Sequence, residues 1–245
     1  MAAPHATPPA QPFTAFEPLL RAALEHGYDL VIDARSPREY AEDHVPGSVN
    51  LPVVDNDEYA EVGTMHRADT HRAYLIGVSY ALKNMSQAID HLVARYPKGA
   101  RMLVYCFRGG KRSKLWFDAL STIGYKVERL PGGWKAYRAW VREQLQSMPA
   151  KYHYHVLCGA TGVGKTRLLD ALSAVGAQVL DLEGLAQHRG SLIGALPGIA
   201  QPTQKWFDSL LLDKLAALIR TSLSGSNRRA RRSAPLNSRL RSWRL

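Results

Sequence analysis

The chain alternates between short apolar runs and longer stretches in which apolar residues recur at helical spacing. Short runs at Asp29 to Asp33, Met102 to Cys106 and Val127 to Leu130 predict buried strands, because each spans only a few residues and ends at a turn. Helical spacing through Ala73 to Val93 and Lys111 to Ile123 predicts helices between them. Strands that alternate with helices predict an α/β fold with a parallel sheet flanked by helices.

Residues that favour helix ends support this division. Ser36 followed by Pro37 predicts the N-cap and first turn of a helix. Gly124 is predicted to end the helix before it, since glycine adopts the left-handed conformation of a helix C-terminus. The turn Pro131 to Trp134 leads into a helix predicted from Lys135 to Gln146.

A second strand–loop–helix unit follows the segment Ser147 to Lys151, which predicts a domain boundary. Strands are predicted at Tyr154 to Cys158 and Gln178 to Leu182, and helices from Thr166 to Val175 and from Thr203 to about Arg220. We therefore predict a flexible leader (1–14), a first domain (15–146), a partial second α/β domain (152–219) and a basic tail (220–245).

The positive charge of the chain is unevenly distributed along the sequence. The formal net charge of the 245 residues is +11, but the segment Arg220 to Leu245 contains eight arginines and no acidic residue. The remaining residues hold 24 basic and 21 acidic side chains, so they are only mildly basic. The first residues lack the basic start and apolar stretch of a secretion signal, and no apolar run is long enough to span a membrane. A cytoplasmic protein without a membrane partner is the prediction.

The two cysteines, Cys106 and Cys158, each end a separate apolar run beside a glycine-rich loop. This placement favours two separate sites over one disulfide, and it fits a reducing compartment. Cys158 is predicted to be a buried strand residue rather than a second nucleophile.

Cys106 is followed by a glycine-containing loop and then a helix, which places its sulfur at a helix N-terminus. Inward N–H groups, the helix dipole and nearby cations all favour the thiolate, the reactive form of cysteine. The same loop would hold a persulfide or selenide anion. The loop residues predicted to form this cradle are Arg108, Gly109, Gly110, Lys111 and Arg112. On local grounds alone, a cysteine that merely fills the core remains the alternative.

The segment Gly159 to Thr166 fits the pattern G-x-x-x-x-G-K-[ST] between a predicted strand and a predicted helix. Lys165 would reach the outer phosphates of a ligand, and Thr166 would face Mg²⁺ if a nucleotide-like ligand brought it. The phosphate-binding residues are predicted to be Gly159, Gly162, Gly164, Lys165 and Thr166. A glycine-rich connecting turn is the alternative.

Asp181 and Glu183 stand at the end of the next predicted strand. Their position suits carboxylates that hold a ligand or its metal, and the alternative is that they cap the following helix. We assign no residue as a ligand of a resident metal.

Four motifs in order resemble the single-domain rhodaneses over about residues 15–145. They are Asp33-Ala34-Arg35, His44-Val45-Pro46-Gly47-Ser48-Val49-Asn50, the Cys106 loop, and Leu130-Pro131-Gly132-Gly133-Trp134. The resemblance implies a rhodanese-like domain with Cys106 as its catalytic residue.

A rhodanese-like domain followed directly by a phosphate loop resembles the bacterial tRNA 2-selenouridine synthase family, from about Leu30 to about Ile219. The most discriminating stretches are Tyr105 to Ser113, Asp181 to Ser191 and Gln201 to Phe207. The resemblance implies an enzyme that replaces sulfur by selenium in wobble 2-thiouridine of tRNA. The implied route passes through an S-geranylated uridine, with geranyl diphosphate and selenophosphate as co-substrates and no tightly bound cofactor.

The resemblance also implies roles and partners. Cys106 would carry selenium in a selenylsulfide-type species, and the loop around Lys165 would hold the diphosphate of the prenyl donor. His188 and Arg189 would bind phosphate or tRNA, with a structural role as the alternative. Besides tRNA, the synthase that makes selenophosphate is the expected partner.

The chain departs from this family near Arg220, beyond which family members continue. Its arginine- and serine-rich sequence there lacks lysine, acidic residues and apolar periodicity, which predicts an out-of-frame end and a truncated chain. A genuine RNA-binding arm is the alternative, since arginine-rich arms gain affinity from phosphate contacts.

Two other functions remain open at this point. The chain could be a simple sulfurtransferase that passes persulfide sulfur from Cys106 to an acceptor, or a non-catalytic RNA-binding module. The segment Gly184 to Ser191 separates the first of these from the selenium enzyme, because a simple rhodanese does not need it.

Overall fold

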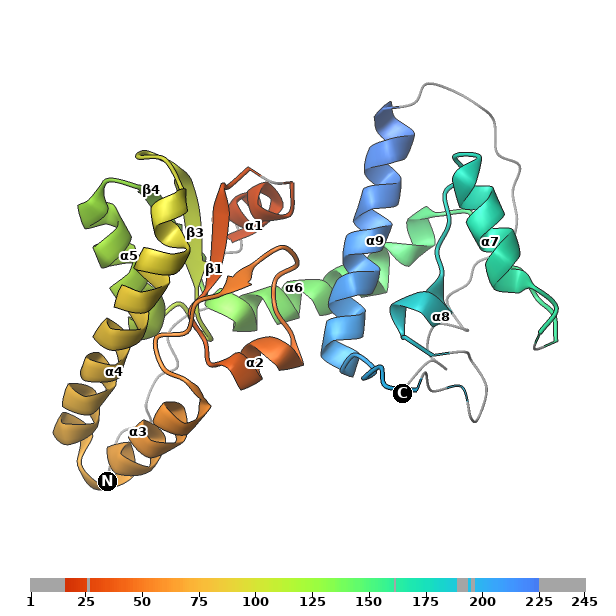
Figure 1. Ribbon diagram of the computed structural model, residues 1–245. Helices are drawn as coiled ribbons and strands as arrows, with labels where there is room; N and C mark the ends of the chain where they lie inside the picture. The colour runs from red at the N-terminus through yellow and green to blue at the C-terminus, as the bar shows by residue number, and fades with distance from the viewer. Residues whose placement is uncertain (1–15, 26, 161, 189–193, 195–196, 225–245) are drawn as a thin grey trace, which may run out of the picture.

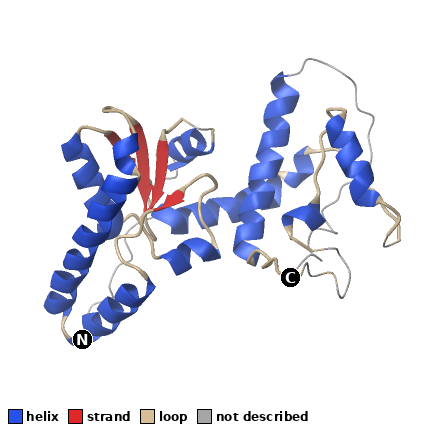
Figure 2. Ribbon diagram, viewed as in Figure 1, coloured by secondary structure: helices blue, strands red, loops and turns tan. Residues whose placement is uncertain are grey.

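The computed structural model describes residues 16–25, 27–160, 162–188, 194 and 197–224. A parallel sheet with helices on both sides forms the first half, and a long helix leads from it to a second half that is helical where it is described (Figures 1 and 2). The predicted leader and most of the predicted tail lie outside the described residues.

The sheet has the strand order β2-β1-β3-β4, and every neighbouring pair is parallel. Its strands are β1 (Leu30–Asp33), β2 (Val49–Asn50), β3 (Arg101–Tyr105) and β4 (Lys126–Arg129). All four residues of β1 are buried, as are the last four of β3, because helices cover both faces of these central strands. The predicted parallel α/β fold is confirmed.

Helices surround this sheet. The first half contains α1 (Phe16–Leu24), α2 (Pro37–Glu42), α3 (Asn56–Ala68), α4 (Thr70–His91), α5 (Lys111–Ile123), α6 (Gly133–Ser147) and the short 3-10 turns η1 (Val93–Arg95) and η2 (Pro149–Lys151). The second half contains α7 (Lys165–Ala174), α8 (Leu182–Leu185) and α9 (Gln204–Ser224). Ser36 caps α2 in a capping box with Glu39, and Gly124 ends α5 with a φ of 103°, as predicted.

Alternate residues of the strands feed two separate cores. Met102 and Val104 face a core with Trp116 and Leu120 of α5. Leu103 and Tyr105 face a second core, whose other members include residues of α1, α6 and α9. The helix α9 therefore belongs to the hydrophobic core of the sheet, although it follows in sequence much later.

The strands predicted in the second half do not form. Residues 154–158 and 178–181 have no regular secondary structure, and Val156 is 55% exposed and Leu157 39% exposed. Cys158 is exposed, so the prediction of a buried strand cysteine is wrong. A strand needs a neighbour for its backbone N–H and C=O groups, and no described segment pairs with either run.

Asp43 joins α9 to the first half. It is fully buried, and its carboxylate accepts hydrogen bonds from Trp134 Nε1 at 2.8 Å and Ser209 Oγ at 2.7 Å. Beside it, Arg138 of α6 forms an ion pair with Asp208 of α9 at 3.0 Å. Burial raises the pKa of Asp43 to about 6, although the Ser209 hydrogen bond and the charge of Arg138 act in the opposite direction.

This shift predicts a pH-dependent stability that Asp43→Asn abolishes. Because the pKa of Asp43 is higher in the folded chain than in the unfolded chain, the protonated carboxyl group stabilises the fold. This contribution is complete below about pH 4 and is lost as the pH rises through about 6. Relative to Asp43→Asn, the wild type should lose about 3 kcal/mol of unfolding free energy between about pH 4 and pH 7. Urea unfolding at several pH values measures this difference.

Asp90→Asn is the matched control, because it removes an exposed carboxylate from α4. An equally large pH-dependent difference for that variant would contradict the assignment to Asp43.

Candidate active site

Cys106 follows β3 directly and is only 3% exposed. Its Sγ accepts a hydrogen bond from the backbone N–H of Gly110 at 3.2 Å, and it lies 3.3 Å from Ser113 Oγ. Gly110 is the N-cap residue of α5, so the sulfur lies at the positive end of a helix. The sulfur therefore has a backbone N–H donor and a hydroxyl group as polar neighbours at the start of a helix.

The turn before α6 holds the Cys106 loop in place. The backbone N–H of Trp134 donates to the carbonyl oxygen of Cys106 at 2.9 Å, and that of Lys135 donates to the carbonyl oxygen of Phe107 at 2.9 Å. Gly133 has a φ of 55°, and a Cβ there would lie 2.1 Å from the Cys106 carbonyl oxygen. Only glycine therefore permits this close approach.

A second close approach involves Gly109. Its φ is 70°, and an added Cβ would lie 3.2 Å from the carbonyl oxygen of Leu130. Arg129 Nη2 donates to the carbonyl oxygen of Gly109. Gly109 is thus held against the end of β4 and the turn that follows it.

The three predicted cations of the loop have different surroundings. Arg112 forms an ion pair with Glu39 of α2, with 2.5 Å between Nη1 and Oε2. Burial would raise the pKa of Glu39, but the hydrogen bond and charge of Arg112 outweigh it and lower the pKa. Arg108 is exposed above the ring of Phe107. Lys111 is also exposed, and it belongs with the surface of α4 described below.

The partner of Arg112 lies on a helix far from it in sequence. Glu39 is visible in the sequence as the third residue of a capping box, a purely local signal. In the structure the same carboxylate also accepts from Arg112, 73 residues later. The positive charge of Arg112 is therefore already partly compensated beside the sulfur.

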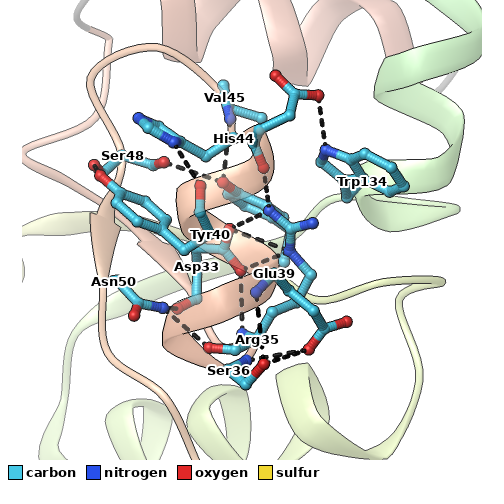
Figure 3. A network of polar contacts seen from close by, with 12 residues as sticks. Asp33, Arg35, Ser36, Glu39, Tyr40, His44, Val45, Ser48, Asn50 and Trp134 are labelled. Atoms are coloured by element: carbon cyan, nitrogen blue, oxygen red, sulfur yellow. Dashed lines mark hydrogen bonds and ion pairs between the residues drawn. The ribbon is translucent and has the colours of Figure 1, made fainter. Parts of the chain in front are cut away.

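A network of polar contacts joins the end of β1, the start of α2, the His44–Asn50 turn and Trp134 (Figure 3). Arg35 and Asp33 form an ion pair with 2.6 Å between Nη2 and Oδ2, and their side chains are 1% and 0% exposed. Arg35 also donates to the carbonyl oxygen of Asp43 at 2.6 Å, and its guanidinium lies 4.9 Å from the ring centre of Trp134. The Asp-x-Arg motif is thus structural.

The His44–Asn50 turn is attached to the same strand ends. The Tyr105 hydroxyl accepts from the backbone N–H of Val45 at 3.1 Å. Asn50 Nδ2 donates to the carbonyl oxygen of Arg35 at 2.8 Å. This motif therefore fixes β1 and β3 at their carboxyl ends, where the Cys106 loop begins.

The predicted phosphate loop precedes α7. Gly162 and Gly164 have φ values of 86° and 84°, so both require glycine-like backbone angles. Lys165 Nζ donates to the carbonyl oxygens of Gly159 and Ala160, both at 3.0 Å. The ammonium group thus lies against the backbone of its own loop, next to the N-terminus of a helix.

The remaining predicted residues are less closely grouped. Thr166 is exposed on the first turn of α7. Asp181 Oδ1 accepts from the backbone N–H of Gly184 at 2.9 Å and caps α8, so the helix-cap alternative describes it. Glu183 and His188 are half-buried, and the backbone N–H of His188 donates to the carbonyl oxygen of Glu183. Arg189 lies outside the described residues.

The structure does not bring the two predicted sites together. Figure 1 shows the Cys106 end of β3 on one side of α9 and the loop before α7 on the other. Within the described part of the chain, no group of three acidic, histidine or cysteine side chains could hold a metal ion. Nor is any described helix both long and apolar enough for a bilayer.

Both halves of the chain match known families. Residues 18–139 match the family described as the rhodanese-like domain, and residues 152–224 match the one described as the tRNA 2-selenouridine synthase AAA domain. The second half therefore matches a family domain, although the strands predicted there do not form.

Curated relatives match across both halves. The tRNA 2-selenouridine synthase of Aeromonas salmonicida is 37% identical over 191 residues, which is 76% of this chain and 49% of the relative. That of Bdellovibrio bacteriovorus is 35% identical over 193 residues, 77% of this chain and 49% of the relative. The chain thus spans about half the length of these relatives.

Among solved structures, a rhodanese-related protein from Thermoplasma volcanium is similar over half of the chain. It is 16% identical, with a TM-score of 0.30, over 50% of this chain and 85% of that one.

The close approach at Gly133 predicts the effect of Gly133→Ala. Alanine at a positive φ costs about 1–2 kcal/mol anywhere, and here its Cβ would also collide with the Cys106 carbonyl. Gly99→Ala is the matched control, since Gly99 has a φ of 82° but no atom within 4 Å of the added Cβ. We expect Gly133→Ala to lower the unfolding free energy by at least about 2 kcal/mol more than Gly99→Ala. Equal losses in urea unfolding would contradict the described contact.

Proposed function

We propose that this chain, which belongs to the tRNA 2-selenouridine synthase family, takes part in replacing sulfur by selenium in 2-thiouridine of tRNA. Membership rests on the match of both halves to family domains and on relatives about 35% identical over most of the chain. The activity itself is a proposal, because the chain spans about half of those relatives.

The observation that carries the proposal is the position of Cys106 Sγ at the N-terminus of α5. The N–H of Gly110 and the helix dipole would stabilise a negatively charged chalcogen there. In the proposed carrier step, Cys106 reacts as a mixed disulfide with a small thiol. Water attacks the phosphorus of selenophosphate, the Se–P bond breaks with its electrons on selenium, and phosphate leaves. The selenide then attacks the Cys106 sulfur and expels the small thiol, which leaves a selenylsulfide on Cys106.

Delivery of selenium follows on the tRNA. The terminal selenide of the Cys106 adduct adds to C2 of the S-geranylated base, and the geranyl thiolate leaves. The small thiol then attacks the Cys106 sulfur, which releases the selenium-containing base as its selenolate and restores the mixed disulfide. We propose that selenophosphate comes from its synthase and that the reaction takes place in the cytoplasm.

The loop around Lys165 is the proposed site for geranyl diphosphate. The sulfur of 2-thiouridine would attack C1 of the geranyl group, and diphosphate would leave with the bonding electrons. Lys165 and the N–H groups at the start of α7 would stabilise this leaving group. If Mg²⁺ accompanies the diphosphate, Thr166 is the residue placed to face it.

One observation favours a second candidate, a sulfurtransferase. The Cys106 loop, its helix and its supporting network all lie within residues 18–139, so this site does not depend on the phosphate loop. Persulfide sulfur on Cys106 could pass to a thiol or cyanide. The non-catalytic RNA-binding alternative rests on the basic tail, most of which is not described.

Two variants separate the proposed partial reactions. With tRNA that contains 2-thiouridine, geranyl diphosphate and selenophosphate, Cys106→Ala should still geranylate the base but lose at least about 100-fold in selenation. Lys165→Ala should lose about 10-fold or more in geranylation, because the leaving group loses a cation. Mass spectrometry of the digested nucleosides measures both products.

Lys98→Ala is the control and should change neither product, because this exposed lysine precedes β3 at the opposite end of the strand from Cys106. Full selenation by Cys106→Ala would refute the role of the cysteine. Thiocyanate formation from thiosulfate and cyanide, with no change in the tRNA, would favour the sulfurtransferase.

A further inference from the structure

The helices α3 and α4 form a hairpin beside the Cys106 loop, and two tyrosines on it are unusually exposed. Tyr59 of α3 is 47% exposed and Tyr74 of α4 is 42% exposed. Figure 1 shows the hairpin extending away from the sheet, and the two helices pack against each other.

Each tyrosine lies next to a cation of α5, the helix that starts at the Cys106 loop. Lys111 Nζ is 3.5 Å from the ring centre of Tyr74, and the Arg112 guanidinium is 5.4 Å from that of Tyr59. Lys111 directly follows Gly110, whose N–H contacts Cys106 Sγ. Both rings are therefore about one long side chain away from the candidate nucleophile.

The tip of the hairpin adds positive charge to this surface. Its exposed basic or titratable residues are His66, Arg67, His71 and Arg72. The ring of His66 lies 5.5 Å from that of Tyr74, at nearly a right angle. Asp69 is the one acidic residue at the tip, and it caps α4 by accepting from the backbone N–H of Arg72 at 2.9 Å.

We infer that this surface, formed by Tyr59, Tyr74, Lys111, Arg67 and Arg72, binds single-stranded RNA. Unpaired bases stack on exposed aromatic rings, and nearby cations contact the phosphates between them. The inference rests on the proposed function and deepens it, because it identifies the part of the fold that presents the tRNA base to Cys106.

The same hairpin also exposes apolar side chains, which a protein partner would prefer. Leu75, Val78 and Leu82 follow one another along α4 and are 60%, 44% and 61% exposed. Beside the start of α5 the surface instead carries two aromatic rings with a cation at each, Lys111 and Arg112, and Arg112 is also paired with Glu39. This chemistry is complementary to an anionic strand with flat bases, so RNA is the partner that the surface fits.

Binding to RNA tests the inference directly. The whole chain is titrated into a labelled tRNA transcript and into a labelled single-stranded oligoribonucleotide with the anticodon-loop sequence, and fluorescence anisotropy gives the Kd. We expect Tyr59→Ala and Tyr74→Ala each to weaken binding of the oligoribonucleotide about 5-fold or more, because each removes a stacking ring. Tyr59→Phe and Tyr74→Phe should stay within about 2-fold of wild type, since they keep the ring.

Charge variants provide an independent measurement. The double variant Arg67→Ala/Arg72→Ala should weaken binding and reduce the slope of log Kd against log salt by about 1–2, one for each lost phosphate contact. Arg95→Ala/Lys98→Ala is the matched control, because it removes two exposed cations beyond the opposite end of α4. That control should leave both the affinity and the slope unchanged.

The folded state of each variant is checked at the sulfur. In a Cys158→Ser background, which removes the exposed second cysteine, the alkylation rate of Cys106 should match that of the parent. Tyrosine-to-alanine variants that keep this rate and still bind RNA like wild type would overturn the inference while leaving the proposed function intact. Absence of RNA binding by the wild type would overturn both.

Discussion

The buried ion pair between Arg35 and Asp33 is the constraint on which the rest of the first half depends. Both side chains are withdrawn from water, so each charge is stable only while the other faces it. Burial disfavours the charged guanidinium, but the hydrogen bond and charge of Asp33 outweigh this and raise the pKa of Arg35. Removing one partner of such a pair typically costs about 3–5 kcal/mol, because the other charge is left unpaired.

From this pair, contacts lead both to the candidate nucleophile and to the second half. Arg35 holds the backbone of Asp43 and lies over the ring of Trp134. The backbone of Trp134 in turn holds the carbonyl of Cys106, while the side chain of Asp43 receives Ser209 from α9. The position of the sulfur and the packing of α9 are thus set by neighbouring groups, which explains how residues from both matched families share one core.

The features that could be predicted from the sequence are those that depend on residues close together in the chain. The helix start at Ser36, the helix end at Gly124 and the position of Cys106 before α5 depend on residues within a few positions of one another. The strand at Tyr154 to Cys158 failed as a prediction because an apolar run becomes a strand only beside a partner, and no described segment pairs with it. The pairs Glu39–Arg112 and Tyr74–Lys111 join helices far apart in sequence, and spacing alone carries no signal for such contacts.

The depth of Cys106 has a consequence for the order of events at the proposed site. With 3% of the residue exposed, the sulfur is reached by a small inorganic donor much more easily than by a nucleobase attached to a folded tRNA. In the proposed reaction, selenium bound to Cys106 would lengthen this side chain by one bond. Burial of the sulfur would thereby favour loading by the small donor before the bulky tRNA base reacts.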